Sequence, residues 1–361
     1  MDIFGEGQYP VSVDYLIALQ EFAAEKGVSA NRLLANTGLS PSVLVRRGSR
    51  IGHLSMDQVV RNVDEALNDP LFPIEYGKRL TISKHGELGY AAQSANTLRD
   101  AAFLIEQYFN IRSGGGEEFQ YIEHEEYVAF RIWPISGEIS LPVLRFQMLS
   151  TLFSIETIGR WLAGVPANVT VPSQMLFSFA FPWPVPVNYL SPGLVLHFDQ
   201  PVNELRLAKS LMGRPLTQAN PDLAQVARLE CEGEAARLKE LNSIVWQVRE
   251  YIHANLGKPT TLEPVACALG VSPRTLKRRL QEAATTFQDI KDSERFRQAM
   301  HRLEMSQDSL ETIGYELGYS DASNFAKAFR SWSGISPGEY RERVMNSVNS
   351  ASAAQSLTKE T

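Results

Sequence analysis

The sequence predicts a multi-domain protein, in which a mixed α+β domain over residues 1–205 precedes an all-α domain over residues 241–345. Three observations support this division. The length of 361 residues is enough for two to three domains that each bury a core. Residues 1–205 alternate between helical and strand-like spacing of apolar side chains. In residues 241–345 the element Leu-Gly-x-Ser occurs twice, at 269–272 and at 317–320.

The first domain begins with helical patterns. Apolar residues three and four apart predict helices in these stretches: YLIALQEFAAEKG (15–27), ANRLLANTGLS (30–40), DQVVRNVDEALN (57–68), TLRDAAFLIEQYFNI (97–111) and 141–163. Residues 118–133 read as two strands joined by a turn at 124–126. Residues 169–208 are strand-like but broken by FPWPVPVNY (181–189), whose alternating prolines exclude a central strand or a helix.

Two polar segments flank the second domain. Residues 206–240 include the polar run LTQANPDLAQVARLECEGEAARLKE and are expected to form a linker with partial helix. Residues 346–361 are small and polar, and we expect a disordered tail there.

The first Leu-Gly-x-Ser copy predicts two helices joined by a short turn. Gly270 ends a helix over 262–269, because glycine tolerates positive φ. Ser272 caps a second helix that starts at Pro273. The apolar Leu276 and Leu280 are expected to face inward; the polar side chains on the other face are Arg274, Lys277, Arg278 and Gln281.

The second copy repeats this plan around Gly318. Phe325 and Phe329 are expected to bury its second helix, and the remaining sides carry Ser323, Asn324, Lys327 and Arg330. Between the copies, TFQDIKDSERFRQAMHRLEMS predicts one helix that could hold the two units apart. After the second copy, SPGE (336–339) predicts a capping box that opens a last short helix.

A helix, a glycine-containing turn and a second helix form the helix-turn-helix pattern, whose second helix can enter the major groove of DNA. Two such units on one rigid helix could place two reading helices in successive major-groove segments. The alternative is an ordinary helical domain with glycine turns. The duplication and the basic outward face of the first copy favour DNA binding.

Composition argues against several other classes of protein. No apolar run is long enough for a membrane span, and the N-terminus lacks the pattern of a signal peptide. The two cysteines fit a reducing cytoplasm, and Cys267 is expected on the buried face of its helix. The scattered histidines predict neither a catalytic nor a metal site, and no cofactor is expected.

Net charge is not informative for the whole chain, which carries −6. Residues 241–345 hold 14 Lys/Arg and 13 Asp/Glu, a balance of only +1. A nucleic-acid surface must therefore come from local clustering, and the densest cluster is Arg274, Lys277, Arg278 and Arg279.

Residues 241–345 resemble the C-terminal DNA-binding domain of AraC/XylS-type transcriptional regulators. The stretch IGYELGYSDASNFAKAFRSWSGISPGEYR (313–341) carries most of this resemblance, together with LGVSPRTLKRRL and RFRQA (295–299). Two departures occur: Gly314 stands where the family usually has Ala, at a cost to the helix of up to ~1 kcal/mol, and Pro264 lies early in the first unit.

The N-terminal domain resembles the sensing half of a subgroup that includes ornithine-utilisation regulators. The matching runs are LLANTGLS, NDPLFPIEYGKRL, HGELGYAAQSANTLRDAAFLIEQY, PVNYL and GLVLHFDQPVNEL. The resemblance implies a cytoplasmic homodimer that binds promoter DNA, contacts RNA polymerase as an activator and responds to a small effector. It identifies no individual effector contact.

Carried over by position, the family's base-reading residues fall on Arg274, Lys277 and Arg278 in the first unit and on Ser323, Asn324 and Lys327 in the second. Arg and Lys can donate to guanine O6 and N7. Arg279 and Arg330 are expected to contact phosphates, or else to be solvated.

Two further interpretations stay open. The chain could be an enzyme or metabolite-binding protein whose C-terminal helices serve assembly, although no cluster of His, Asp and Cys supports catalysis. It could also bind DNA constitutively without an effector. The segment FPWPVPVNYL could line an effector pocket, belong to a dimer surface or simply pack as an irregular loop.

Overall fold

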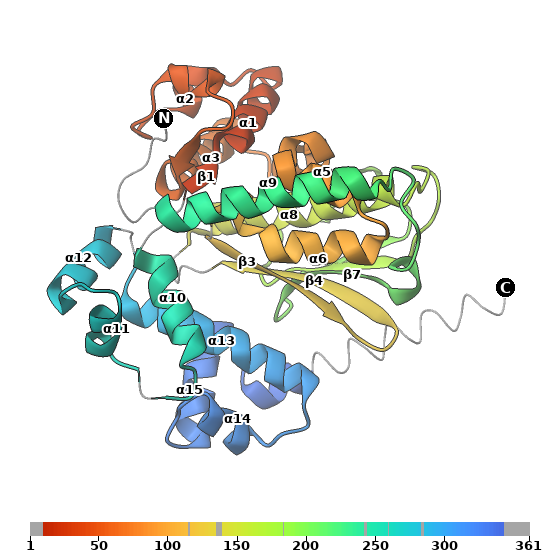
Figure 1. Cartoon of the computed structure of the whole chain (residues 1–361). Coiled ribbons are helices and arrows are strands. Elements are labelled where there is room, and N and C mark those ends of the chain that lie inside the picture. Colours follow the sequence, from red (N-terminus) through yellow and green to blue (C-terminus); the bar gives the residue numbers. More distant parts are fainter. Residues whose placement is uncertain are drawn as a thin grey trace. The chain divides into compact units, whose positions relative to one another are not determined.

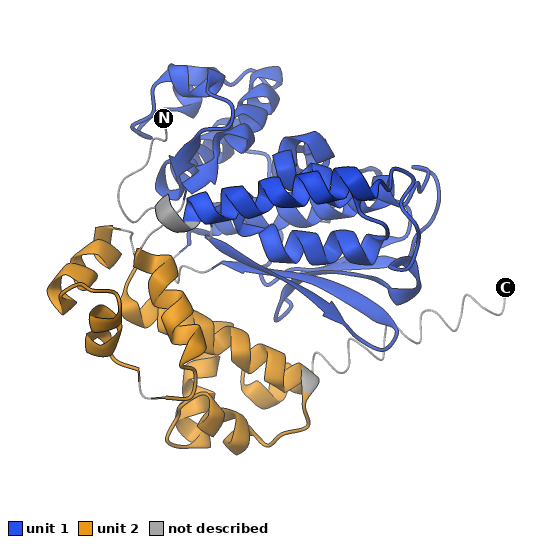
Figure 2. Ribbon diagram, in the orientation of Figure 1, with its two compact units in different colours: residues 1–243 blue, residues 244–361 orange. Residues whose placement is uncertain are grey.

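The computed structural model describes residues 10–114, 116–134, 139–182, 184–241, 244–258, 260–282 and 285–342. The chain divides into two compact units, Met1–Ser243 and Ile244–Thr361 (Figure 2). The expected tail over 346–361 lies outside the described residues.

Unit 1 opens with a helical part. Its elements are β1 (Pro10–Ser12), α1 (Val13–Glu25), α2 (Ala30–Leu33), η1 (Pro41–Val45), β2 (Arg50–Gly52), α3 (His53–Leu67), α4 (Phe72–Arg79) and η2 (Ile82–His85). Strands β1 and β2 pair antiparallel. Ser12 caps α1, since its hydroxyl accepts a hydrogen bond from the Asp14 amide. The inward faces of α1 and α3 form one apolar core with α4 and α8, including Leu16, Phe22, Val59, Phe72 and Phe146.

The rest of unit 1 is built on a five-stranded sheet in the order β3-β4-β7-β5-β6. Figure 1 labels three of these strands, β3, β4 and β7. All neighbours pair antiparallel except β5 and β6, which are parallel. The remaining elements are α5 (Gly86–Ser94), α6 (Leu98–Tyr108), α7 (Asn110–Ser113), β3 (Glu117–Glu123), β4 (Tyr127–Pro134), α8 (Leu141–Leu162), β5 (Ser173–Leu176), η3 (Val187–Tyr189), β6 (Leu194–His197), β7 (Asn203–Ala208), η4 (Lys209–Leu211) and α9 (Pro221–Leu241). The predicted hairpin at 118–133 and the helix at 141–163 are confirmed.

Helices α6 and α8 pack on one face of this sheet. The alternate residues Phe130 and Ile132 of β4 join the apolar core there, together with Met148 and Phe153 of α8. Helix α4 approaches α8 very closely, because a Cβ at Gly77 would lie 2.5 Å from the Ser150 carbonyl oxygen.

The opposite face of the sheet carries a buried charged group. Arg131 of β4 donates to Glu204 of β7 through Nε at 2.9 Å and through Nη2, and Arg206 donates to the other carboxylate oxygen. Burial alone would raise the pKa of Glu204, but the two guanidinium groups lower it to about 2. Glu204 is therefore ionised at neutral pH.

Helix α9 differs from the linker expected over 206–240. That range contains the end of β7, then η4 and nearly all of a 21-residue helix within unit 1. Ala227, Cys231 and Leu238 of α9 are buried in a core with Leu88 of α5 and Tyr108 of α6. The polar composition masked this helix, and the narrow stripe of buried residues on one side of it is enough to hold it on the domain.

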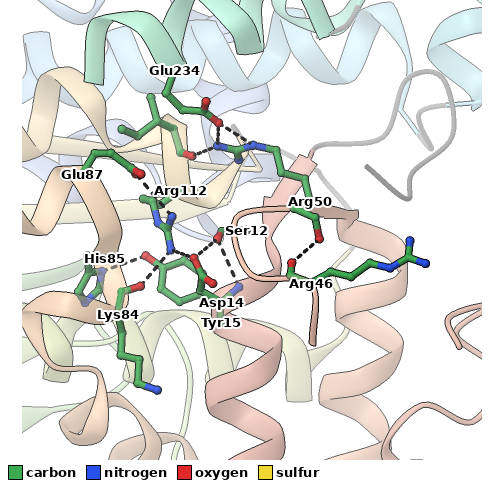
Figure 3. A network of polar contacts seen from close by, with 12 residues as sticks. Ser12, Asp14, Tyr15, Arg46, Arg50, Lys84, His85, Glu87, Arg112 and Glu234 are labelled. Atoms are coloured by element: carbon green, nitrogen blue, oxygen red, sulfur yellow. Dashed lines mark hydrogen bonds and ion pairs between the residues drawn. The ribbon is translucent and has the colours of Figure 1, made fainter. Parts of the chain in front are cut away.

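A buried arginine ties α9 to the beginning of the chain (Figure 3). Arg50 of β2 donates to Glu234 of α9 through Nε at 3.1 Å and Nη2 at 2.6 Å. Its Nη1 also donates to the Pro10 carbonyl at 2.7 Å, and Nη2 donates to the Ile111 carbonyl at 2.5 Å. One guanidinium thus joins β1, β2, α7 and α9.

Arg112, which follows Ile111 in α7, is a second buried arginine that joins separate segments of the chain (Figure 3). Its Nη2 donates to Asp14 at 2.9 Å and to the Lys84 carbonyl at 3.0 Å. The adjacent Tyr15 hydroxyl hydrogen-bonds His85 Nδ1 at 2.9 Å. Burial is the main cause that lowers the pKa of His85 to about 4, so the imidazole is neutral at pH 7.

Unit 2 is all helical. Its helices are α10 (Ile244–Ala254), α11 (Leu262–Ala268), α12 (Pro273–Glu282), α13 (Phe287–Met305), α14 (Leu310–Glu316) and α15 (Ala322–Ser333), and residues 337–342 are also helical. The predicted fold class, a mixed α and β domain followed by a helical domain with two helix-turn-helix units, is confirmed.

Among the residues that the structure describes, no helix combines the length and apolar character needed to cross a bilayer. Within the same residues, no three His, Cys, Asp or Glu side chains gather in a way that could hold a metal ion.

Candidate DNA interface

The first helix-turn-helix unit consists of α11 and α12. Helix α11 ends at Gly270, which has φ +67°, and the Val271 amide donates back to the Ala266 carbonyl at 3.0 Å. Ser272 then caps α12, because its hydroxyl accepts from the Thr275 amide at 3.1 Å. Thr261 stands at the N-cap of α11 but makes no capping hydrogen bond with its side chain.

The second unit, α14 and α15, repeats these bonds. Gly318 has φ +79°, and the Tyr319 amide donates to the Gly314 carbonyl at 2.9 Å. Asp321 caps α15 by accepting from the Asn324 amide at 2.8 Å. The two copies are therefore the same local structure, as the doubled sequence predicts.

The copies differ by one residue in their turns. The turn glycines, Gly270 and Gly318, are 48 positions apart, whereas the capping residues, Ser272 and Asp321, are 49 positions apart. Residues at equivalent positions on α12 and α15 are therefore 49 positions apart in the sequence. Leu276 and Leu280 correspond to Phe325 and Phe329, and all four are buried.

Helix α13 joins the units, as the intervening sequence predicts. A capping box between Thr286 and Asp289 starts it, and its 19 residues span about 28 Å at 1.5 Å per residue. Ala299 and Leu303 are buried in the helical core. Phe296 packs against Phe329 and Trp332 of α15, with ring centroids at 5.3 and 5.7 Å. These contacts fix α15 on α13.

The three residues predicted to read bases in the first unit are exposed. Arg274, Lys277 and Arg278 lie at helical spacing on one side of α12, opposite Leu276 and Leu280. Arg278 forms an ion pair with Glu282 one turn further along the helix. Such an exposed pair contributes about 0–1 kcal/mol, so Arg278 can leave it at little cost.

The predicted residues of the second unit are also exposed, on α15. Asn324 is already engaged: its side-chain amide donates to Ser320 at 3.0 Å and to Asp321 at 2.8 Å. Hydrogen bonds from the Asn324 backbone and from Ser320 lower the pKa of Asp321, and Lys327 adds a smaller Coulombic effect. Asn324 therefore helps to build the helix start, whereas Ser323 and Lys327 extend from the exposed side.

The two predicted phosphate contacts differ in exposure. Arg330 is exposed on α15. Arg279 is partly buried, and its Nε is enclosed without a hydrogen-bond partner. Only part of the Arg279 guanidinium can reach a ligand.

One expectation about an individual residue is wrong, and a second residue has a further role. Cys267 is exposed, so its predicted place on the buried face of α11 is wrong; Val265 and Ala266 face inward instead. Gly314, expected to loosen α14, also has a packing role. A Cβ there would lie 3.0 Å from the Cβ of Phe325, so the glycine lets α15 approach closely.

Unit 1 contains a separate concave site, of which the sequence indicated only the wall formed by the end of FPWPVPVNYL. A pocket of about 350 Å³ is lined by Glu75, Lys78 and Arg79 of α4 and by Asn188 and Tyr189 of η3. Glu75 and Tyr189 are 114 residues apart, so no local pattern connects them. The one available signal was the proline-rich segment that ends at Tyr189.

Comparisons with known proteins cover both units. The sequence model described as the arabinose-binding domain of AraC transcription regulators matches residues 27–216, and a helix-turn-helix domain model matches residues 265–343. The ornithine utilization regulator of Pseudomonas aeruginosa is 30% identical over 344 residues, which cover 92% of this chain and 96% of that protein. An uncharacterised helix-turn-helix transcriptional regulator of Mycobacterium tuberculosis is 24% identical, covering 94% of this chain and 97% of the relative.

Among solved structures, the transcriptional regulator CdpR of Pseudomonas aeruginosa is similar at 19% identity and a TM-score of 0.45, covering 91% of this chain and 98% of that one. The matching relatives are transcriptional regulators, which are not enzymes, so the enzymatic interpretation is not supported. The matches over both units and across most of the chain establish that it belongs to the AraC family of DNA-binding transcriptional regulators.

Proposed function

We propose that this regulator binds double-stranded promoter DNA with α12 and α15 together and that a small effector bound by unit 1 controls this binding. The observation that carries the proposal is the repeated design of unit 2. Each second helix buries two apolar side chains against its own unit and leaves a polar side in solvent. Two second helices joined by one linking helix, α13, support a proposal in which each of them enters its own groove segment.

Base reading is assigned to Arg274, Lys277 and Arg278 on α12 and to Ser323, Asn324 and Lys327 on α15. An arginine or lysine paired with guanine discriminates by about 1–3 kcal/mol, more than the exposed Arg278–Glu282 pair contributes. Arg330, and the accessible part of Arg279, would hold phosphates.

The test compares Arg278→Ala, Lys327→Ala and Arg330→Ala on a mapped operator and on random DNA. Base readers should lose about 5- to 100-fold on the operator and little on random DNA, whereas Arg330→Ala should weaken both equally. Equal losses on both DNAs for Arg278→Ala would contradict its assignment.

The affinity of the unmodified protein for DNA should also fall steeply as the salt concentration rises. A flat salt response would argue against phosphate contacts.

Effector control is proposed from the family of the N-terminal domain. Binding would shift the population of arrangements in which unit 2 engages DNA. Because one relative is named an ornithine utilization regulator, L-ornithine is the first compound to test.

We further propose that the protein acts in the cytoplasm as an activator that contacts RNA polymerase. Transcription in vitro with purified bacterial RNA polymerase should rise with effector; unchanged DNA binding and transcription would instead favour constitutive binding.

A homodimer is proposed through α9. Leu223, Val226 and Leu229 are 57%, 57% and 54% exposed and lie three residues apart along this helix. An apolar row on a fastened surface helix would be covered by a second copy of the chain. Val226→Glu should shift the mass measured by light scattering toward the monomer, whereas Gln225→Glu on the same helix should not. A dimer unaffected by Val226→Glu would place the interface elsewhere.

A further inference from the structure

We propose that the pocket between α4 and η3 in unit 1 is an effector site for a small amino acid, a molecule that carries both a carboxylate and an ammonium group. This inference rests on the proposed effector control and gives it a place and a chemistry. The pocket volume of about 350 Å³ lies at the lower end of the range for small-molecule sites.

Lys78 is the group suited to the ligand carboxylate. Its Nζ donates to the Tyr189 carbonyl at 2.5 Å, the single hydrogen bond it makes among the described residues. An ammonium has three donors, so two remain for a ligand. Burial lowers the pKa of Lys78, and the charge of Glu156 compensates only in part. A cation that lacks full compensation is stabilised when an anion binds beside it.

Glu75 is the group suited to the ligand ammonium. One of its oxygens accepts from the Tyr189 hydroxyl at 2.8 Å, and the other faces Lys26 Nζ at 2.6 Å. These contacts hold the carboxylate in place and outweigh the effect of burial, so the pKa of Glu75 is lowered. A carboxylate has about four acceptor positions, so this anchored group can still accept from a ligand.

Tyr189 connects the two halves of the pocket. Its carbonyl accepts a hydrogen bond from Lys78, and its hydroxyl donates one to Glu75. One residue of η3 therefore positions both the cationic and the anionic side chain of the pocket. Fixed groups of opposite sign in so small a space suit a ligand that is itself dipolar, since binding then needs little rearrangement. Arg79, the other charged residue that lines the pocket, forms an ion pair with Glu25 of α1. Its guanidinium is therefore less available to a ligand than Lys78.

The first experiment measures binding to the full-length chain by isothermal titration calorimetry and by thermal shift. The probes are L-ornithine, L-lysine, L-arginine and L-glutamate, with putrescine as a diamine that lacks the carboxylate. At least one amino acid should bind and raise the melting temperature, and putrescine should not. No binding by any of the four amino acids would overturn the ligand class.

Variants then locate the site. Lys78→Met should weaken binding of the amino acid about 10- to 100-fold, the loss expected for a charged hydrogen-bond partner. Lys84→Met is the matched control, because Lys84 pairs with Glu21 outside the pocket. If Lys78→Met also lowers the melting temperature of the free protein, Asn188→Asp gives a second test. Asn188 is exposed, and the added negative charge should repel the ligand carboxylate, whereas Asn31→Asp on α2 should have no effect.

The outcomes separate the site from the proposed function. Binding that is lost in Lys78→Met and Asn188→Asp but kept in both controls supports the site. Unchanged binding in both pocket variants places the ligand elsewhere. If the pocket binds an amino acid but operator affinity and transcription do not respond, the site stands and effector control fails.

Discussion

Glu234→Gln should loosen α9 from the domain that it completes. The carboxylate of Glu234 receives two hydrogen bonds from the Arg50 guanidinium, at 3.1 and 2.6 Å. The Arg50 side chain is 4% exposed and that of Glu234 is 20% exposed. The substitution keeps the shape and one acceptor oxygen but removes the charge that balances a buried arginine.

The size of the effect follows from this geometry. Breaking a fully buried ion pair by removing one partner costs about 3–5 kcal/mol. Water can reach one side of Glu234, the glutamine oxygen can still accept, and Arg50 keeps its bonds to the Pro10 and Ile111 carbonyls. We therefore expect a smaller loss of about 2 kcal/mol in the local stability of α9 and β1.

Hydrogen exchange measured by mass spectrometry resolves this loss segment by segment. A decrease of about 2 kcal/mol corresponds to roughly 30-fold faster exchange in peptides from α9 and β1 when exchange follows local opening. Glu230→Gln is the control, because it makes the same chemical change at an exposed position of the same helix. Identical exchange in the two variants would refute the reasoning that Arg50 fastens α9.

Three further predictions concern stability. Ser272→Ala removes the cap of α12 and should lower the stability of unit 2 by about 1 kcal/mol in urea unfolding, unlike Ser331→Ala; an equal effect would mean that the cap contributes nothing. Gly270→Ala and Gly318→Ala should each cost about 1–2 kcal/mol, because both glycines have positive φ; a loss at only one would show that the turns are not equivalent. Glu204→Gln should cost about 3–5 kcal/mol at pH 7. Since the pKa of Glu204 is depressed to about 2, this difference should shrink as pH falls from about 4.5 toward 2, and a gap that stays constant over that range would contradict the ionised state.

Local signals in the sequence predicted α11 to α15 of unit 2, whereas α10 (Ile244–Ala254) was not predicted. Its helix starts follow from Ser272, Thr286 and Asp321, and its turns follow from Gly270 and Gly318, because capping and positive φ depend on neighbouring residues alone. The side of a helix that faces inward is harder to assign. Cys267 follows two buried residues, and a rotation of about 100° per position turns it outward.

Unit 1 was less predictable because its decisive contacts join distant segments. Helix α4 contains Pro73 and Gly77, which weaken a helical pattern, yet Gly77 is needed for the close approach to Ser150. The arginine that fastens α9 lies 184 residues before its carboxylate partner. Such pairings come from the assembled fold and leave no mark on the local sequence.

The one-residue difference between the turns affects how the two reading helices could be exchanged by engineering. A chimera aligned on the repeated Leu-Gly pairs would transplant Lys277 onto position 325, where Phe325 is fully buried. Counting from the capping residues instead brings Arg274 to position 323 and Arg278 to position 327, both in solvent. Designers who wish to give both units the same base preference must therefore graft with the longer offset, or the transplanted charges will destroy the second core.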